Sequence, residues 1–295
     1  MDYAQPKNLD EALRLLASDA PDGRSSGVTS THTERWAILS GGTDLYPGSL
    51  ERPLVNRVLD IHALSELKSI SFDASTVRIG AGVTWSDVID AEVPPAFNAL
   101  KLAARELGSV QIQNKATVVG NLCNASPAAD GVPPLLILNA SVELRSLAGI
   151  RQIPLQDFIL GNRQTASKSD EMVTAIVIPA EAATGRSAFL KLGARKYLVI
   201  SISMVAARLA CDDRGLISEA AVSVGSCSLV AQRLTSLEAA LQGQTITTDL
   251  VDLVTPEHLT SLSPIEDVRS SSRYRLDASL ELVRRTLTCL TSKKT

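Results

Sequence analysis

The chain has 295 residues, of which 45% are hydrophobic and only 3% aromatic, and its formal net charge at pH 7 is −3. This composition predicts a globular protein with room for two or three sub-domains and a core of aliphatic side chains. The negative charge and the lack of a long basic run argue against a nucleic-acid partner. No apolar stretch approaches the ~20 residues of a membrane span, and the N-terminus lacks a signal pattern, so we predict a cytoplasmic protein.

The cysteines and histidines are scattered along the chain rather than clustered. No C-x-x-C pair occurs, and the three histidines lie far apart. Iron–sulfur and zinc sites require clustered ligands, so we expect no metal site in this chain. We expect reduced thiols, three of them in core or strand positions. The cysteines are Cys123, Cys211, Cys227 and Cys289.

The N-terminal part of the chain is predicted to begin with a helix. Residues 8–18 place apolar side chains at helical spacing, with Asn8 as the N-cap. Residues 21–27 are typical of a polar loop. The apolar run 36–39 and residues 56–61 then predict two short strands, the first of them buried.

A glycine-rich stretch at residues 39–45, Leu-Ser-Gly-Gly-Thr-Asp-Leu, follows the first strand. Two glycines allow a sharp turn and let another group approach the main chain closely. Thr43 or Asp44 could cap the next helical turn, where free N–H groups favour an anion. A phosphate cradle is one interpretation of this pattern, and a plain turn is the other.

The middle of the chain predicts alternating hairpins and helices. Residues 66–72 and 76–79 form one predicted hairpin, and residues 141–145 and 151–154 form another. The remaining predicted elements are a helix from Thr84, a packing helix within residues 95–107 and a strand at 171–178 that Pro179 ends.

Residues 111–131 form a second candidate site. They are rich in small and amide side chains and carry almost no charge. This composition suits a loop whose backbone N–H groups and short side chains face a polar ligand. A long surface loop built from turn residues is the competing interpretation.

Beyond residue 180 the pattern changes to long β-prone runs, which predict an antiparallel meander. These runs are residues 188–192, 201–210 and 218–226. Residues 229–241 and 273–290 predict helices that cover one face of the sheet. We therefore expect two domains, residues 1–180 and 181–295.

The two polar stretches, about 75 residues apart, resemble the FAD-binding subunit of the molybdenum hydroxylases, a family that includes xanthine, carbon monoxide and nicotinate dehydrogenases. The family motif (A/V)-G-G-T-(D/E)-L corresponds to residues 40–45. The motif T-(L/I)-G-G-N-L-x-x-A-S-P-x-(A/S)-D corresponds to residues 117–130. The opening at residues 6–12 and the region from about 181 also match.

The resemblance implies an α+β fold with a two-lobed FAD-binding domain of the PCMH/vanillyl-alcohol-oxidase type, whose lobes divide near residues 55–60. A C-terminal domain of the CO dehydrogenase flavoprotein type would follow, with an antiparallel sheet and covering helices. Two positions depart from the family. Val119 replaces the first glycine of G-G-N, so we expect an ordinary backbone conformation there, because a β-branched residue does not readily take φ > 0. Val199 stands where many relatives carry an acid.

The resemblance also implies that FAD lies between the two domains. Backbone N–H groups and the side chains of Thr43, Thr117 and Asn121 would bind its diphosphate, because convergent neutral donors can hold an anion. Asn124 and Asp130 would bond the sugar or ribityl groups. The implied cofactor-binding residues are Ile38, Leu39, Ser40, Gly41, Gly42, Thr43, Asp44, Leu45, Leu107, Thr117, Val118, Val119, Gly120, Asn121, Asn124, Asp130, Val173, Lys191 and Tyr197.

Four of these residues would act near the cofactor rings. A cationic Lys191 beside the N1–C2=O edge would stabilise the anionic reduced flavin and raise its potential. A solvated strand lysine is the alternative. Tyr197 would stack on or shield the isoalloxazine. Leu107 and Val173 would make apolar ring contacts, although simple core packing would give the same pattern.

The implied function is that of an oxidoreductase subunit, with no catalytic residue or metal ligand of its own. A large molybdopterin subunit would hydroxylate an N-heterocycle or similar substrate, and a small subunit would relay electrons through [2Fe–2S] clusters. This chain would pass them from FAD to NAD⁺ or another acceptor, in a dimer of heterotrimers. The hydroxybenzoyl-CoA reductase branch is disfavoured, because no cysteine-bearing insertion lies between Asp130 and Val142.

Two other functions compete with this one. A stand-alone FAD oxidoreductase would need a catalytic acid or tethering histidine near the flavin, and the histidines lie outside both motifs. A flavin-free scaffold subunit is the second alternative, for which Val119 is the evidence. A P-loop NTPase is excluded, because the chain contains no G-x-x-x-x-G-K-(S/T) motif.

Overall fold

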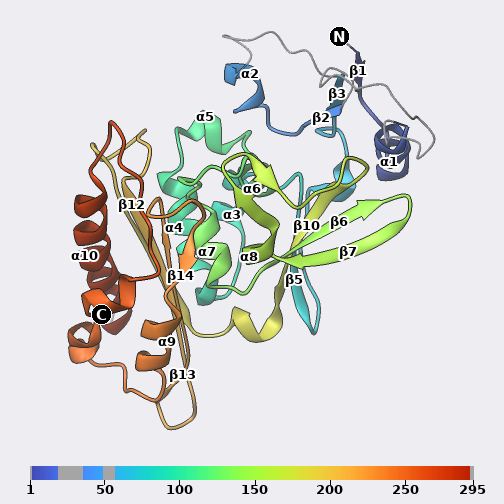
Figure 1. Ribbon diagram of the computed structural model, residues 1–295. Coiled ribbons are helices and arrows are strands. Elements are labelled where there is room, and N and C mark those ends of the chain that lie inside the picture. Colours follow the sequence, from blue (N-terminus) through green and yellow to red (C-terminus); the bar gives the residue numbers. More distant parts are fainter. Residues whose placement is uncertain (1, 19–35, 49–56, 293–295) are drawn as a thin grey trace.

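The computed structural model describes residues 2–18, 36–48 and 57–292. The polar loop predicted at 21–27 lies outside these residues. Helices and strands are mixed throughout the described parts, as Figure 1 shows, and the predicted α+β class is confirmed. No helix within the described ranges is long and apolar enough to cross a membrane.

A small parallel sheet forms the N-terminal lobe, in the strand order β1-β3-β2. Its strands are β1 (Tyr3–Ala4), β2 (Trp36–Leu39) and β3 (Arg57–Asp60), and α1 (Leu9–Ala17) and α2 (Leu45–Gly48) belong to the same part of the chain. The predicted cap of α1 is confirmed, because the Asn8 side chain accepts a hydrogen bond from the Glu11 N–H. The expectation of a buried strand at β2 was wrong, since only Leu39 is buried and Ile38 is 39% exposed.

An antiparallel five-stranded sheet forms the centre of the next part, in the order β4-β5-β10-β6-β7. Its strands are β4 (Ile70–Phe72), β5 (Thr76–Gly80), β6 (Ser141–Ser146), β7 (Gly149–Pro154) and β10 (Met172–Pro179). Both predicted hairpins are present. The first arm is shorter than expected because a 3₁₀ turn, η1 (Ser65–Leu67), occupies its start.

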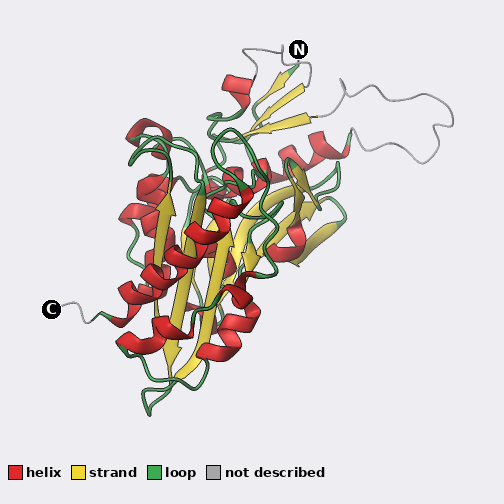
Figure 2. Cartoon of the chain, turned by 60° about the vertical axis from the view of Figure 1, so that its left-hand side comes forward, coloured by secondary structure: helices red, strands yellow, loops and turns green. Residues whose placement is uncertain are grey.

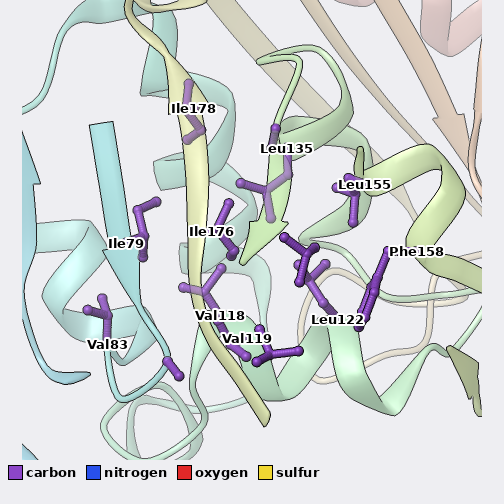
Figure 3. Packing of buried hydrophobic residues seen from close by; sticks show 14 of the residues in the cluster. Ile79, Val83, Val118, Val119, Leu122, Leu135, Leu155, Phe158, Ile176 and Ile178 are labelled. Atoms are coloured by element: carbon purple, nitrogen blue, oxygen red, sulfur yellow. The ribbon is translucent and has the colours of Figure 1, made fainter. Parts of the chain in front are cut away.

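Short helices belong to the same part of the chain, and some of them contact this sheet. They are α3 (Trp85–Asp90), η2 (Pro95–Phe97), α4 (Asn98–Glu106), α5 (Val110–Gln113), α6 (Val118–Asn124), α7 (Val132–Leu136) and α8 (Leu155–Phe158). A two-stranded ribbon of β8 (Ile159–Gly161) and β9 (Gln164–Thr165) and the turn η3 (Ala180–Ala183) complete this part. Figure 3 shows Val118, Val119 and Leu122 of α6 in the same apolar cluster as Ile176 and Ile178 of β10.

The prediction of a loop at residues 111–131 was wrong, because much of this stretch is helical. Ser109 and Thr117 cap α5 and α6 with their side chains, and burial of Val118 and Leu122 holds α6 in place. Capping side chains and apolar burial thus override the weak helix propensity of the small and amide residues.

The C-terminal part is an antiparallel meander with helices on one side. Its elements are β11 (Arg186–Leu192), β12 (Ser203–Cys211), β13 (Ile217–Gly225), β14 (Gln232–Arg233), α9 (Thr235–Leu241), η4 (Thr248–Leu253), η5 (Pro256–Leu259) and α10 (Ser272–Thr291). The first predicted helix began too early, because residues 232–233 pair with β13 instead.

Both faces of this sheet are covered, which joins the two halves of the chain. Val205 and Leu209 of β12 pack in one cluster with α9 and α10, which Figure 2 shows in front of the strands. On the other face, Phe189 and Met204 pack against Ala99 and Ala103 of α4. The alternation follows from the two-residue period of a strand.

The four cysteines are all free thiols, but the prediction that three are core or strand residues was wrong. Cys227 is buried and Cys211 lies in β12, although its side chain is exposed. Cys123 and Cys289 are exposed residues of α6 and α10.

Candidate functional site

A cavity of about 540 Å³ lies where the N-terminal lobe, α6, β10 and the β11–β12 connection meet. Its volume is within the range of small-molecule and cofactor sites. All of the predicted site residues line this cavity except Val118 and Tyr197. Those that line it are Ile38, Leu39, Ser40, Gly41, Gly42, Thr43, Asp44, Leu45, Leu107, Thr117, Val119, Gly120, Asn121, Asn124, Asp130, Val173 and Lys191.

The two motif stretches touch each other at the cavity. A Cβ atom on Gly41 would overlap the backbone carbonyl of Lys115. Gly42 has a φ of +71°, and a Cβ there would lie 2.6 Å from the ring of Tyr46. Both positions therefore require glycine, one for close backbone approach and the other also for its left-handed conformation.

The glycine loop, defined here as residues 40–45, presents unpaired backbone donors. Within the part of the chain that the structure describes, the N–H groups of residues 40–43 donate no hydrogen bond to the protein. The loop is fixed through its carbonyls instead, because Gly42 O and Asp44 O accept from the Tyr46 and Gly48 N–H groups at 3.2 and 3.0 Å. Successive free N–H groups of this kind form a concavity that suits an anion.

The second stretch offers fewer free donors than we expected. The Thr117 hydroxyl accepts from the Gly120 N–H at 3.0 Å, and the Val118 N–H donates to Val83 O at 3.1 Å. Asn121 Oδ1 accepts from the Gly131 N–H at 3.3 Å, which leaves its NH₂ group for a ligand. The Thr117 hydroxyl hydrogen remains available as well. The predicted binding of a diphosphate by backbone N–H groups and side chains of residues 117–121 stays a prediction, for which the Thr117 hydroxyl and the Asn121 amide are the available side-chain donors.

Val119 is the second residue of α6, with a helical backbone and a side chain only 5% exposed. The expectation of an ordinary conformation at this position is confirmed, because Val119 is not among the residues with positive φ. Because the backbone is helical at this position, it does not require a glycine, and valine is accommodated without backbone strain.

Two buried charged side chains, Lys191 and Asp130, line the cavity, and Ser201 supports them; we name these three residues the charged wall. Lys191 Nζ lies 2.6 Å from Asp130 Oδ2, and the Ser201 hydroxyl donates to Asp130 Oδ1 at 2.6 Å. The Lys191 side chain is 6% exposed, so the solvated-lysine alternative was wrong. Burial raises the pKa of Asp130, and the bonds from Lys191 and Ser201 oppose that rise.

A second buried cation supports the charged wall from behind. Arg275 is 2% exposed and donates to Ile202 O at 2.6 Å and to Ser226 O at 3.0 Å. Its other nitrogen lies 2.8 Å from Asp267 Oδ1. Burial alone would raise the pKa of Asp267, but hydrogen bonds from the Arg269 N–H and the Arg275 guanidinium lower it to about 2.

The structure does not bring Val118 or Tyr197 to the cavity. Val118 is fully buried in the core. Tyr197 is 60% exposed, and the Lys196 ammonium lies 5.2 Å from its ring centroid. Leu107 and Val173 each pack against the core cluster and line the cavity, so cofactor contact stays a prediction for both.

Several residues that were not predicted to bind the cofactor also line the cavity, some of them inside the stretch 111–131. They are Ile61, Ala81, Trp85, Gly108, Ile112, Ala116, Cys123, Ala128, Met172, Val199 and Ile200. Most are apolar neighbours of the motifs, whose sequence pattern is that of ordinary core residues. Trp85 is adjacent to Thr84, which bridges to Thr117. That pairing of distant segments could not be read from either one alone.

Comparison with known proteins places nearly the whole chain in one family. Residues 1–181 match the family model of the FAD binding domain in molybdopterin dehydrogenase. Residues 188–290 match the CO dehydrogenase flavoprotein C-terminal domain. The two matches follow one another in the order that the family resemblance implies.

Individual relatives agree with the family matches. The nicotinate dehydrogenase FAD-subunit of Eubacterium barkeri is 32% identical, over 94% of this chain and 91% of the relative. The xanthine dehydrogenase FAD-binding subunit of Escherichia coli O157:H7 is 28% identical, over 93% and 90%. The solved carbon monoxide dehydrogenase of Hydrogenophaga pseudoflava superposes with a TM-score of 0.82 at 25% identity, covering 98% of this chain and 96% of that chain. The free N–H donors of the glycine loop, which line the cavity, fit a dinucleotide diphosphate. This chain therefore belongs to the FAD-binding medium subunits of the molybdenum hydroxylase family, which are oxidoreductases with FAD as their cofactor.

Proposed function

We propose that this chain carries FAD as the electron-transfer subunit of a heteromeric molybdenum hydroxylase. It would take electrons from [2Fe–2S] clusters of a small partner subunit and pass them to NAD⁺ or another external acceptor. A large molybdopterin subunit would hydroxylate an N-heterocycle or similar substrate. The observation that carries the proposal is the meeting of two distant motif stretches, at Gly41 and Lys115, on one cofactor-sized cavity.

The residues of the cavity have distinct roles in this proposal. The free N–H groups of the glycine loop, the Thr117 hydroxyl and the Asn121 amide would hold the diphosphate. Leu107 and Val173 would exclude water from the apolar part of the cofactor. Bound FAD would supply reversible redox chemistry, and the protein would supply position and electrostatics.

The charged wall refines the role expected of Lys191. Its ammonium lies 2.6 Å from the Asp130 carboxylate, so the pair carries no net charge. We propose that Lys191 offers directed N–H donors to the flavin, held in orientation by Asp130 and Ser201. It would raise the flavin potential less than an isolated buried cation would, because the nearby carboxylate opposes its field.

The domain division, assembly and location are also part of the proposal. We propose a PCMH-type FAD-binding domain at 1–180, in two lobes divided near 55–60, and a CO dehydrogenase-type flavoprotein domain at 181–295. Two hydrophobic clusters support the division, because one is built mostly from residues before 181 and the other from residues after it. We further propose a dimer of heterotrimers and a cytoplasmic location.

Co-purification of the tagged full chain with its genomic neighbours tests the proposal. We expect a yellow complex with one FAD per chain, a large molybdenum subunit and a small iron–sulfur subunit. Anaerobic addition of the complex's substrate should reduce the iron–sulfur clusters and bleach the flavin absorption. Addition of an electron acceptor should then restore the flavin absorption.

The same preparation separates the competing functions. A chain that stays colourless after FAD addition would support the flavin-free scaffold. A yellow monomer that turns over a substrate without partners would support the stand-alone oxidoreductase. Either result would contradict the proposed function.

A further inference from the structure

We propose that Arg163 is a positioning residue for the cofactor, because its ion pair with Asp44 neutralises an acid built into the glycine loop. This inference rests on the proposed function, in which the loop holds the FAD diphosphate. Arg163 lies between β8 and β9, outside both motifs and 119 positions from Asp44 in sequence.

The contact between Arg163 and Asp44 is bidentate. Arg163 NH1 lies 3.0 Å from Asp44 Oδ2, and NH2 lies 3.3 Å from Oδ1. Asp44 has no other side-chain hydrogen bond to the residues that the structure describes. The paired N–H···O geometry orients the carboxylate as well as balancing its charge.

The backbone around Arg163 places its side chain toward the glycine loop. Arg163 has a φ of +56°, and its N–H donates to Ala125 O at 3.2 Å. Ala125 is the left-handed C-cap of α6, whose first residues line the cavity. The β8–β9 turn is therefore attached to the second motif stretch while its arginine reaches the first.

Charge explains why this contact matters for an anionic ligand. A diphosphate would approach a loop that carries the Asp44 carboxylate in the cavity wall. Like charges at close range repel, and Lys191, a buried cation that lines the cavity, is already paired with Asp130. Arg163 neutralises the −1 charge of Asp44 and so removes that repulsion.

Titration of the flavin-free full chain with FAD, followed by flavin fluorescence, tests the inference. We expect R163A to bind FAD about three- to tenfold more weakly than wild type, the range for a partly exposed charge. The matched control is R214A, which removes another partly exposed Arg–Asp pair, in the β12–β13 turn, and should stay within about twofold. The D44N/R163A double variant should recover most of the lost affinity, because no acid then needs neutralising.

Salt supplies a second readout. The deficit of R163A relative to wild type should shrink as NaCl rises from about 0.05 to 0.5 M, because salt screens the repulsion between Asp44 and the diphosphate. Equal affinity of R163A and wild type would overturn the inference alone. A double variant as weak as R163A would also overturn it, since Arg163 would then bind the diphosphate directly. Failure of wild type to bind FAD would overturn the proposed function together with this inference.

Discussion

The two ends of the cavity differ in how their polar groups are satisfied. At the glycine loop, the N–H groups of residues 40–43 have no partner in the described part of the protein, and the Asp44–Arg163 pair is at least half exposed. At the charged wall, the Lys191 and Asp130 side chains are only 6% and 8% exposed. Ser201 occupies the second oxygen of Asp130.

The two ends differ because an unpaired polar group costs a different amount of free energy at each of them. Residues 40–43 are only half-buried and line an open cavity, so water can solvate their N–H groups until a ligand replaces it, and leaving them unpaired costs little. A buried charge has no such substitute and must be paired by the protein itself. We conclude that a ligand can replace water at the N–H groups of the glycine loop, whereas the charges of the charged wall are already paired by the protein in the absence of a ligand.

Breaking the charged wall should have the largest effect. K191M leaves the Asp130 carboxylate buried without its cation, which should lower the free energy of unfolding of the flavin-free chain by about 3–5 kcal/mol. Urea denaturation at pH 7 measures this change. A loss below about 1 kcal/mol would show that the pair is not needed to hold the wall.

The pH dependence of K191M gives a further check on the same residue. Burial raises the pKa of Asp130, and without Lys191 only the hydrogen bond from Ser201 opposes that rise. An acid with a raised folded-state pKa destabilises the fold when it ionises, so K191M should regain stability as the pH falls from 8 toward 5. The K191M/D130N double variant, which has no buried acid, should lose less stability than K191M and show no such recovery.

Separating the two motif stretches should have the next largest effect. A Cβ on residue 41 overlaps the Lys115 carbonyl, so G41A must push the glycine loop away from the second stretch. We expect a loss of about 1–3 kcal/mol in unfolding free energy, typical of overpacking, and at least tenfold weaker FAD binding. G48A is the matched control, because a Cβ at that glycine would meet nothing within 4 Å. Equal FAD affinities of the two variants would refute the close contact.

Acid should weaken the support behind the charged wall by a smaller amount. Asp267, which binds Arg275, has a pKa lowered to about 2 from an ordinary 3.8. An acid with a lowered folded-state pKa stabilises the fold fully above its ordinary pKa, and this contribution disappears as the pH falls from about 4 to 2. Wild type should exceed D267N in unfolding free energy by about 1–2 kcal/mol at pH 6, a value discounted for partial exposure.

The control for this prediction is E281Q, which breaks an exposed i,i+4 pair with Arg285 on α10. Urea denaturation of wild type, D267N and E281Q should be compared at pH 6 and pH 3. The difference between wild type and D267N should shrink on acidification, whereas E281Q should follow wild type at both values. A difference that is the same at both pH values would contradict the assignment to Asp267.

Local patterns were sufficient to predict much of the fold. The Asn8 cap and apolar spacing located α1, a hairpin-like pair of segments located β6 and β7, and long β-prone runs located β11 to β13. The sequence failed at residues 111–131, where helices α5 and α6 are built from residues of weak helix propensity. Their caps and buried faces gain their energy from tertiary contacts, which no local window contains.

The candidate site likewise has some features that could be predicted from the sequence and others that could not. The glycine loop and the second stretch were recognisable, because each needs particular residues at adjacent positions. The pairing of Lys191 with Asp130, the role of Ser201 and the reach of Arg163 to Asp44 were not, because each joins segments more than 60 positions apart. Nothing in the sequence around Arg163 distinguishes it from an ordinary turn residue.

The smallest expected effect concerns the stability of the glycine-loop end. R163A removes an ion pair whose side chains are 66% and 50% exposed, so the unfolding free energy of the flavin-free chain should change by only about 0–1 kcal/mol. The same variant should bind FAD more weakly, and its thermal stabilisation by saturating FAD should therefore be smaller than that of wild type at equal ligand concentration. Urea denaturation without FAD and thermal denaturation with FAD measure the two quantities. A loss of unfolding free energy in the flavin-free chain as large as that of K191M would mean that the Arg163–Asp44 pair stabilises the fold. The proposed difference between the glycine loop and the charged wall would then be wrong.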